Sequence, residues 1–329
     1  GNLMRRLSAA GFKQEFARRA VLPDWWSDAC AEDELLLPDI EIRVARFVGV
    51  PVAAVRDPSA ELVAPRYARA QLRRVKDVDR DRLGAAIHAA TQISSAVVRT
   101  MGGDAPDVRL PPPEFAAWRA EIVRSGPLIE LTDLLRDLWS RGIPVIQLET
   151  LPRPLFQGMA WIAGERPVVV VGHRLDEPAR LAFVIAHEVG HIVNGDCAAD
   201  APVIDEEEEV TDDHESERRA DEYAIGVLTG GTPVPSLSAA DFKDLATKAL
   251  QVEKKHHVDA AAVIWSWARR TGDYALATMA SRALYRNKGG KRAIRAAFDQ
   301  SVDLDAASET DRALLRCVAG DPENDAAAY

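Results

Sequence analysis

Hydrophobic positions recur three and four residues apart through most of the chain, which is the period of an amphipathic helix. In residues 38–49, for example, Ile40, Val44 and Val48 fall on one face. The stretch VARFVGVPVAAVRDP, a helix followed by a glycine turn and a short helix, is compatible with a helix-turn-helix-like bundle. The helices predicted in the N-terminal third cover residues 11–20, 38–49, 52–55 and 80–100.

The pattern changes in the middle of the chain, where short β-prone runs follow two predicted helices. The runs cover residues 143–148, 158–162 and 167–171, and the last contains four consecutive valines. The helices predicted around them cover 114–124, 128–141, 177–193 and 214–228, with an acidic loop over 195–213, and helical periodicity returns over 236–286. The predicted fold is therefore α+β and mostly helical, with a small β-sheet packed against the helix over 177–193.

Turn signals and shifts in pattern divide the chain into four predicted parts. Residues 1–101 form a helical, helix-turn-helix-like domain, and residues 102–113, with three consecutive prolines, form a linker. Residues 114–235 form the core domain that contains the predicted sheet. Residues 236–329 form a helical region that completes or flanks the cleft of that core.

Composition and charge narrow the classes of function. With 329 residues and 47% hydrophobic residues, the chain is able to bury a full core. Its net charge of −10 argues against general, charge-driven DNA binding. Three widely spaced cysteines, Cys30, Cys197 and Cys317, favour a reducing compartment over a disulfide framework. No run is long and apolar enough for a membrane span and no secretory signal is visible, so a cytoplasmic location is expected.

One motif carries chemistry. The helix predicted over 177–193 contains His187-Glu188-Val189-Gly190-His191, an HExxH sequence. Histidines at i and i+4 lie on one helix face and are able to reach a single zinc ion, and the glutamate after the first histidine is placed to handle a water molecule. Leu181, Ile185 and Ile192 belong to the apolar face of the same helix. The alternative is a helix with two surface histidines and a salt-bridging glutamate.

A third ligand is expected from the next helix, because catalytic zinc sites use three protein ligands and one open position. Glu217 and Asp221 lie four residues apart at the edge of its apolar stripe. One of them is able to bind the metal while the other hydrogen-bonds a ligand histidine. An ordinary charged helix face, with pairs such as Arg218 and Glu222, is the alternative. Glu215 and Cys197 are further candidates for the third ligand.

At this point the chain resembles a known family. The segments WSRGIPVIQLE, GMAWIAGERPVVVV, RLAFVIAHEVGHIVNGD and ESERRADEYAIGVL, in that order, resemble the ImmA/IrrE family of bacterial zinc metallopeptidases over about residues 128–230. The resemblance implies a zincin-like core with one Zn²⁺ per chain. It implies that His187, His191 and Glu217 are the metal ligands and that Glu188 is the general base. Asp221 stands where family members usually carry Asn or Asp.

The resemblance also implies a function. Family members cleave, or are thought to cleave, helix-turn-helix transcriptional repressors in stress, phage-related or toxin–antitoxin-like responses. A metallo-endopeptidase with a DNA-binding repressor or antitoxin as its protein substrate is therefore expected. Residues 158–162 are expected to form an edge strand that aligns the substrate as an added strand. The candidates for stabilising the oxyanion are His173, His214 and Tyr223, each of which also has a structural interpretation.

Two other functions stay open from the sequence. The chain could be a non-catalytic module that binds a repressor, or a DNA-binding regulator that keeps the peptidase fold. Direct nucleic-acid contact has weak support: the supposed recognition stretch offers only Arg56, and the single basic concentration lies around Arg282–Arg295. The acidic run 205–209 could attract a basic substrate or be a solvated loop. The Cys197 thiolate could silence the metal, or Cys197 could be an incidental thiol.

Overall fold

The structure is a computed structural model of the chain. It describes residues 2–27, 30, 33–63, 71–73, 77–101, 105–123, 128–148, 150–152, 156–172, 175–197, 203–205, 215–284 and 289–318. Of residues 71–73, 77–82, 204 and 205 only the backbone is described. The chain is mostly helical with a small mixed sheet, so the predicted fold class is confirmed.

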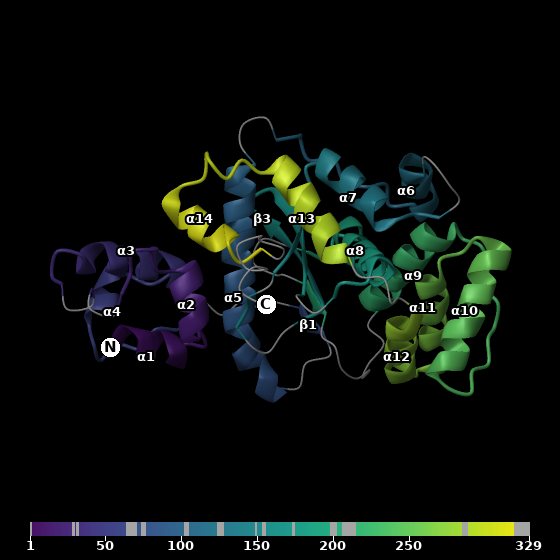
Figure 1. Cartoon of the computed structure of the whole chain (residues 1–329), viewed down its shortest axis with the longest axis horizontal. Coiled ribbons are helices and arrows are strands. Elements are labelled where there is room, and N and C mark those ends of the chain that lie inside the picture. The colour runs from purple at the N-terminus through teal and green to yellow at the C-terminus, as the bar shows by residue number, and fades with distance from the viewer. Residues whose placement is uncertain are drawn as a thin grey trace.

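Helices account for most of the described residues and lie on both sides of the sheet (Figure 1). The N-terminal helices are α1 (Asn2–Ala9), α2 (Gln14–Ala20), α3 (Leu37–Val48), α4 (Val52–Arg56) and α5 (Asp77–Thr100). The central helices are α6 (Phe115–Ile122), α7 (Leu131–Ser140), α8 (Pro178–Val193) and α9 (Glu215–Thr229). The C-terminal helices are α10 (Phe242–His256), α11 (Ala260–Thr271), α12 (Tyr274–Leu284), α13 (Gly290–Ser301) and α14 (Glu309–Leu315).

The sheet has five strands in the order β1-β5-β3-β4-β2. The strands are β1 (Gln71–Arg73), β2 (Val145–Gln147), β3 (Gly158–Ala163), β4 (Arg166–Val171) and β5 (Val203–Asp205). A two-residue turn joins β3 to β4 in an antiparallel hairpin, and Gly164 begins it at a φ of 66°, which glycine adopts without strain. β2 pairs with β4 in parallel, and β5 pairs with β3 antiparallel.

The position of β3 corrects one expectation. Residues 158–162 were expected to form an edge strand, but β3 is the central strand of the sheet. β4 pairs with it along its whole length, and β5 pairs with Gly158, Met159 and Ala160 on the other side. The backbone of this half of β3 is therefore already hydrogen-bonded and does not offer an edge to a substrate.

The four valines of β4 show how the sheet is buried. Successive side chains of a strand point to opposite faces. Val168 and Val170 belong to one apolar cluster and Val169 and Val171 to a second. The first cluster takes residues from α1–α5 and α14, and the second takes residues from α6–α9. Both faces are thus covered, which explains why this strand reads as a continuous apolar run.

The N-terminal helices and α14 meet in the first cluster. Helix α14 packs against α5 and α2, and Arg99 of α5 forms an ion pair with Asp311 of α14 at 2.5 Å. The Arg19 Nε–H of α2 donates a hydrogen bond to the carbonyl oxygen of Arg316 at 3.0 Å. A third cluster joins α10, α11 and α12. The predicted domain boundaries at residues 101, 113 and 235 stay a prediction.

Candidate metal centre

Helix α8 is the structural basis of the site. It begins after Glu177 with Pro178 in its first turn, where a missing N–H costs nothing. Gly195, at a φ of 72°, follows its end. Every residue from Arg180 to Ile192 is buried, including both histidines and the glutamate of the HExxH motif. A helix that is buried all round must find partners for the polar groups on its surface.

The second helix of the site, α9, comes unusually close to α8. Gly190, inside the motif, faces Ala220 of α9, and a Cβ added to Gly190 would lie 2.9 Å from the Ala220 Cα. Such a distance is too short for two carbon atoms, so only glycine permits this approach. The close contact of α8 and α9 brings the Glu217 carboxylate, one turn before Ala220, over the two histidines.

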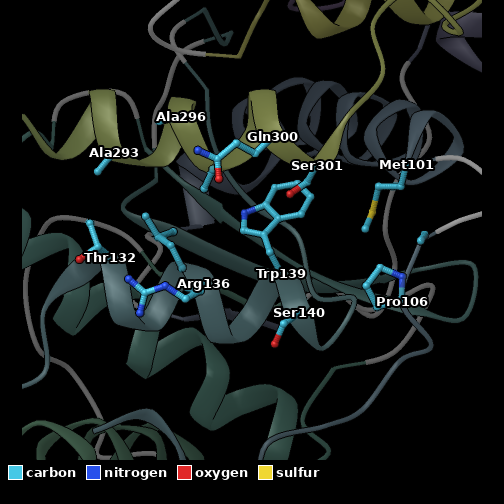
Figure 2. A pocket seen from close by; sticks show the side chains of 13 residues that line it. Met101, Pro106, Thr132, Arg136, Trp139, Ser140, Ala293, Ala296, Gln300 and Ser301 are labelled. Atoms are coloured by element: carbon cyan, nitrogen blue, oxygen red, sulfur yellow. The ribbon is translucent and has the colours of Figure 1, made fainter. Parts of the chain in front are cut away.

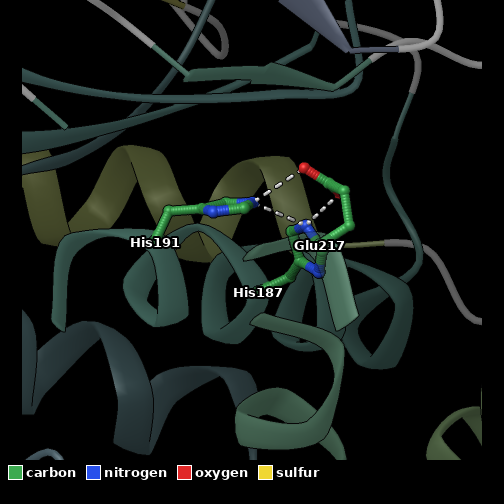
Figure 3. Close-up of side chains that lie close together, drawn as sticks. All are labelled: His187, His191 and Glu217. Atoms are coloured by element: carbon green, nitrogen blue, oxygen red, sulfur yellow. Dashed lines mark hydrogen bonds and ion pairs between the residues drawn. The ribbon is translucent and has the colours of Figure 1, made fainter. Parts of the chain in front are cut away.

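His187, His191 and Glu217 converge on one point (Figure 3). The Nε2 atoms of the two histidines are 3.1 Å apart. Each is 3.4 Å from a different oxygen of the Glu217 carboxylate. All three residues are buried, with exposed fractions of 4%, 0% and 5%. Among the residues that the structure describes, they form the one group of three or more His, Cys, Asp or Glu side chains whose ligand atoms converge in this way.

The other nitrogen of each histidine is bound to a carboxylate. His187 Nδ1 lies 2.9 Å from Asp221 Oδ1, and His191 Nδ1 lies 2.9 Å from Asp196 Oδ2. Arg219 donates a hydrogen bond to the other oxygen of Asp196 at 3.3 Å. A carboxylate that accepts the Nδ1–H fixes the ring and leaves Nε2 with its lone pair free for a metal. The arrangement therefore presents two Nε2 donors.

Of these two carboxylates, the sequence indicated one. Asp221 was predicted to hydrogen-bond a ligand histidine, and it lies at that place. Asp196 was missed. The only signal for it was its position just after Gly195, where the backbone turns at the end of α8, because its amide donates back to the His191 carbonyl oxygen at 3.0 Å. This turn folds the chain back after the end of α8 and places the Asp196 side chain beside His191.

Glu188, the residue after His187 in α8, has no exposed surface. Strand β3 passes directly over it: a Cβ added to Gly158 would overlap the Glu188 carboxylate. Gly158 has an ordinary backbone conformation, so the glycine is needed here for space and not for its φ. Gly158, the first residue of β3, thus leaves room for the carboxylate of Glu188, which is not one of the three converging side chains.

The C-terminal helices support this arrangement from one side. Trp265 of α11 stacks on Phe183 of α8, with ring centroids 5.4 Å apart, and Phe183 in turn lies 6.3 Å from the His187 ring. Arg269 of α11 forms an ion pair with Glu222 of α9 at 2.5 Å. The hydrogen bond from Arg269 lowers the pKa of Glu222 below its ordinary value. Helix α11 is therefore attached to both metal-site helices.

The donor set fits a metal ion. Two imidazole nitrogens and a carboxylate are the ligands that catalytic zinc sites combine, and three protein ligands leave one position open. The same donors also accept other divalent metals, so the chemistry of the ligands alone does not fix the metal. The structure thus supports a buried His-His-Glu group able to hold a metal ion.

Other predicted participants lie elsewhere. Tyr223, a candidate for the oxyanion, donates its hydroxyl hydrogen to the Pro112 carbonyl oxygen at 2.7 Å and stacks on Trp118. Burial raises its pKa well above its ordinary value. These contacts favour the structural interpretation of Tyr223 over a role in stabilising the oxyanion. Glu215 is exposed and 3.7 Å from Arg219, outside the converging group. His173, His214 and residues 206–209 lie outside the described residues.

Cys197 is half-buried and packs against the second apolar cluster. It is not a member of the converging group among the described residues. Its predicted regulatory role stays a prediction.

The helix-turn-helix-like segment is present as α3, a turn at Gly49 and α4. Helix α4 has only five residues. Arg56, the one cation of the supposed recognition stretch, forms an ion pair with Glu41 of α3 at 2.7 Å. In the basic concentration near the C-terminus, Arg295 pairs with Asp299 at 2.7 Å. Neither observation adds support for a nucleic-acid interface.

Comparison with protein-family models, curated proteins and solved structures finds no match for this chain. Within the described residues, none of the helices combines the length and the apolar character that a membrane crossing requires.

Proposed function

We propose that this protein is a zinc-dependent endopeptidase of the kind found in the ImmA/IrrE family. The observation that carries the proposal is the buried group of His187, His191 and Glu217, together with the buried Glu188 that follows His187 in the same helix. A structural histidine pair would not require an acidic side chain from another helix to converge on the same point as the two imidazoles. It would also not require a carboxylate on each Nδ1.

In this proposal His187, His191 and Glu217 hold the metal. When bound, zinc supplies a Lewis acid that polarises a carbonyl group and makes a water molecule more acidic. Asp221 and Asp196 keep the two imidazoles in the tautomer that has its lone pair on Nε2. Gly190 keeps α9 close enough for the Glu217 carboxylate to reach both rings.

Glu188 is the general base. Its carboxylate accepts the proton of the attacking water and later gives that proton to the amine of the departing peptide. A carboxylate with no exposed surface is shielded from bulk water, so it exchanges protons with the groups at the reaction centre. The backbone at Gly158 limits the space on one side of the carboxylate and thereby restricts its orientation.

The substrate we propose is a DNA-binding regulatory protein, a helix-turn-helix repressor or an antitoxin, cleaved in a stress, phage-related or toxin–antitoxin-like response. The net charge of −10 supports an encounter with a basic DNA-binding protein. Because β3 is the central strand and pairs with β5, its edge does not receive the substrate as an added strand.

The test is cleavage of candidate repressors by the wild-type chain and by Glu188→Gln, with the zinc content of both measured. The amide removes the base and keeps nearly the same volume, so zinc should stay bound while the rate falls by about 10²–10⁴. Gly158→Ala should act in the same direction, because its methyl group displaces the Glu188 carboxylate. Glu34→Gln, at an exposed position, is the matched control and should keep full activity.

A zinc-loaded Glu188→Gln that still cleaves at the wild-type rate would contradict this assignment of the base. If the wild type binds repressors and zinc but cleaves none of them, the non-catalytic binding function replaces the endopeptidase.

A further inference from the structure

A second candidate site lies between helices α7 and α13 (Figure 2). The cleft there has a volume of about 680 Å³. Small-molecule sites usually occupy about 300–1,000 Å³. None of the residues that line this cleft belongs to the metal group or carries its carboxylates. The cleft is therefore a separate feature of the fold, and its ligand does not depend on the proposed peptidase activity.

Both walls of the cleft are single helix faces. The residues of α7 that line it are Thr132, Leu135, Arg136, Trp139 and Ser140. These positions follow the spacing i, i+3, i+4, i+7 and i+8, which marks one face of a helix. From Thr132 to Ser140 the helix rises about 12 Å, which is enough for a molecule with two fused rings or a short acyl chain plus a polar group.

The opposite wall on α13 has the same spacing but smaller side chains. Its residues are Ala293, Ala296, Ala297, Gln300 and Ser301. Three alanines facing α7 keep the two helices from filling the space between them. Small residues alone do not make a site, and the groups that point to a ligand are on the α7 wall.

Trp139 is the first of those groups. Its side chain is almost completely buried, with 6% exposed, and Figure 2 shows its indole extending from α7 toward α13 in the centre of the cleft. The indole Nε1–H is buried and has no hydrogen-bond partner among the described residues. Buried donors are nearly always satisfied in proteins, so this N–H is a donor available to an acceptor that enters the cleft. Gln300, exposed beside it, is free to change rotamer and admit that acceptor.

Arg136 is the second group. It lies with Thr132 toward one end of the cleft, whereas Met101 and Pro106 lie toward the other end (Figure 2). Its Nη1 forms an ion pair with Asp133 at 3.0 Å, and its side chain is 56% exposed. A guanidinium group has five N–H donors, so one ion pair leaves donors for a ligand anion. The cleft thus has a guanidinium group at one end, and apolar side chains alternate with hydroxyl and amide groups along its length.

We propose that this cleft binds a small amphipathic anion, with a flat aromatic or short acyl body and one carboxylate. The carboxylate lies at Arg136 and accepts a hydrogen bond from the Trp139 indole. The body lies between Trp139 and the alanines of α13 and extends toward Met101. A docked peptide helix fits less well, because its anchors at i, i+4 and i+7 repeat over a groove longer than two turns.

The experiment is calorimetric titration of the full-length protein with 1-naphthoate and with 1-naphthalenemethanol, which has the same ring system without the charge. The wild type should bind 1-naphthoate saturably, with a Kd below about 1 mM, and should bind the alcohol about tenfold more weakly. Arg136→Gln should weaken 1-naphthoate about tenfold and leave the alcohol unchanged. Arg292→Gln, on an exposed part of α13 outside the cleft, is the matched control and should bind as the wild type does.

Two further variants locate the site. Thr132→Phe and Ala296→Phe each place a ring in the cleft from an exposed position, one from each wall. Both should remove binding of both probes while the circular dichroism of the protein stays unchanged. If one of these variants fails to fold, binding to the other variant tests the location of the site. The proposal is overturned if the wild type shows no saturable binding of 1-naphthoate, if the folded wall variant still binds, or if Arg136→Gln leaves 1-naphthoate unaffected.

Discussion

His88 lies in the N-terminal part of the molecule and His187 and His191 lie in α8, and all three are buried. The environment of His88 is apolar and aromatic: its ring packs against Phe12 and Phe47. Its Nε2 lies 2.5 Å from the Phe47 carbonyl oxygen. The histidines of α8 instead direct Nε2 toward each other and toward Glu217, with a carboxylate behind each ring.

This difference separates a structural histidine from a ligand. Burial lowers the pKa of His88 and keeps it neutral, and one backbone carbonyl is the partner that its Nε2 needs. At α8, the two imidazoles and Glu217 are buried together, and the side chains of Asp196 and Asp221 behind the rings are 10% and 16% exposed. So many buried polar groups are costly unless something of opposite charge joins them. The comparison shows a group able to hold a cation at α8 and a single structural histidine at His88.

The largest effect should come from removing one Nε2 donor. His191→Ala leaves one imidazole and one carboxylate, so zinc affinity should fall more than the roughly 100-fold that the loss of a supporting carboxylate causes. Competition with a chromogenic chelator measures it. His88→Gln is the matched control and should bind zinc as the wild type does. Equal losses of affinity in the two variants would remove the distinction between the two regions.

A smaller effect is expected from the carboxylates behind the rings. Asp196→Asn and Asp221→Asn each replace a charged acceptor with a neutral one, so zinc affinity should fall by about 10–100-fold. The same chelator competition measures it. Asp39→Asn, on the exposed surface of α3, should leave affinity unchanged. Wild-type affinity in both site variants would show that these carboxylates do not orient the rings.

The third prediction concerns His88, the structural histidine, and the dependence of the free energy of unfolding on pH. Burial depresses the pKa of His88 in the folded state, so the unfolded chain binds its proton first as the pH falls. The contribution of neutral His88 to the free energy of unfolding is complete above about pH 6.5 and is lost as the pH falls below it. His88→Gln keeps a donor for the Phe47 carbonyl and removes the titration. Urea denaturation between pH 5 and 7 should therefore show a shallower dependence for the variant, and equal slopes would contradict it.

The smallest effect is expected at the helix-turn-helix-like segment. Arg56 is largely exposed and pairs with Glu41 on the surface, and such pairs contribute about 0–1 kcal/mol. Arg56→Ala should change the free energy of unfolding by less than about 0.5 kcal/mol and leave zinc binding unchanged. Urea denaturation checks the first value. Salt-dependent DNA binding by the wild type that this variant loses would instead give α4 a role in DNA recognition.

The elements that bear local patterns were predictable. The helices expected over 177–193 and from 214 to 228 match α8 and α9 to within one residue at each end. The β-prone runs expected over 158–162 and 167–171 match β3 and β4 to within one residue at each end. His187 and His191 were identified because the spacing of HExxH is itself a local pattern. The spacing on the second helix left Glu217 and Asp221 as alternatives, and the resemblance to a family favoured Glu217.

Long-range features escaped prediction for a physical reason. Strands β1 and β5 have three residues each, too few to show a period, and β5 was assigned to the acidic loop. β5 is what turns β3 from an edge strand into the central one. The space that Gly158 leaves for Glu188, and the cleft between α7 and α13, arise from contacts between residues far apart in the sequence. No spacing along the chain reports such contacts.

The most direct test is the metal content of the purified wild type and of Glu217→Ala, measured by mass spectrometry under identical conditions. The account predicts about one zinc per chain in the wild type and clearly less in the variant, because a third protein ligand is lost. A wild type that stays metal-free after zinc is added back would contradict the metal centre. Full retention of zinc by Glu217→Ala would contradict the assignment of Glu217 as the third ligand.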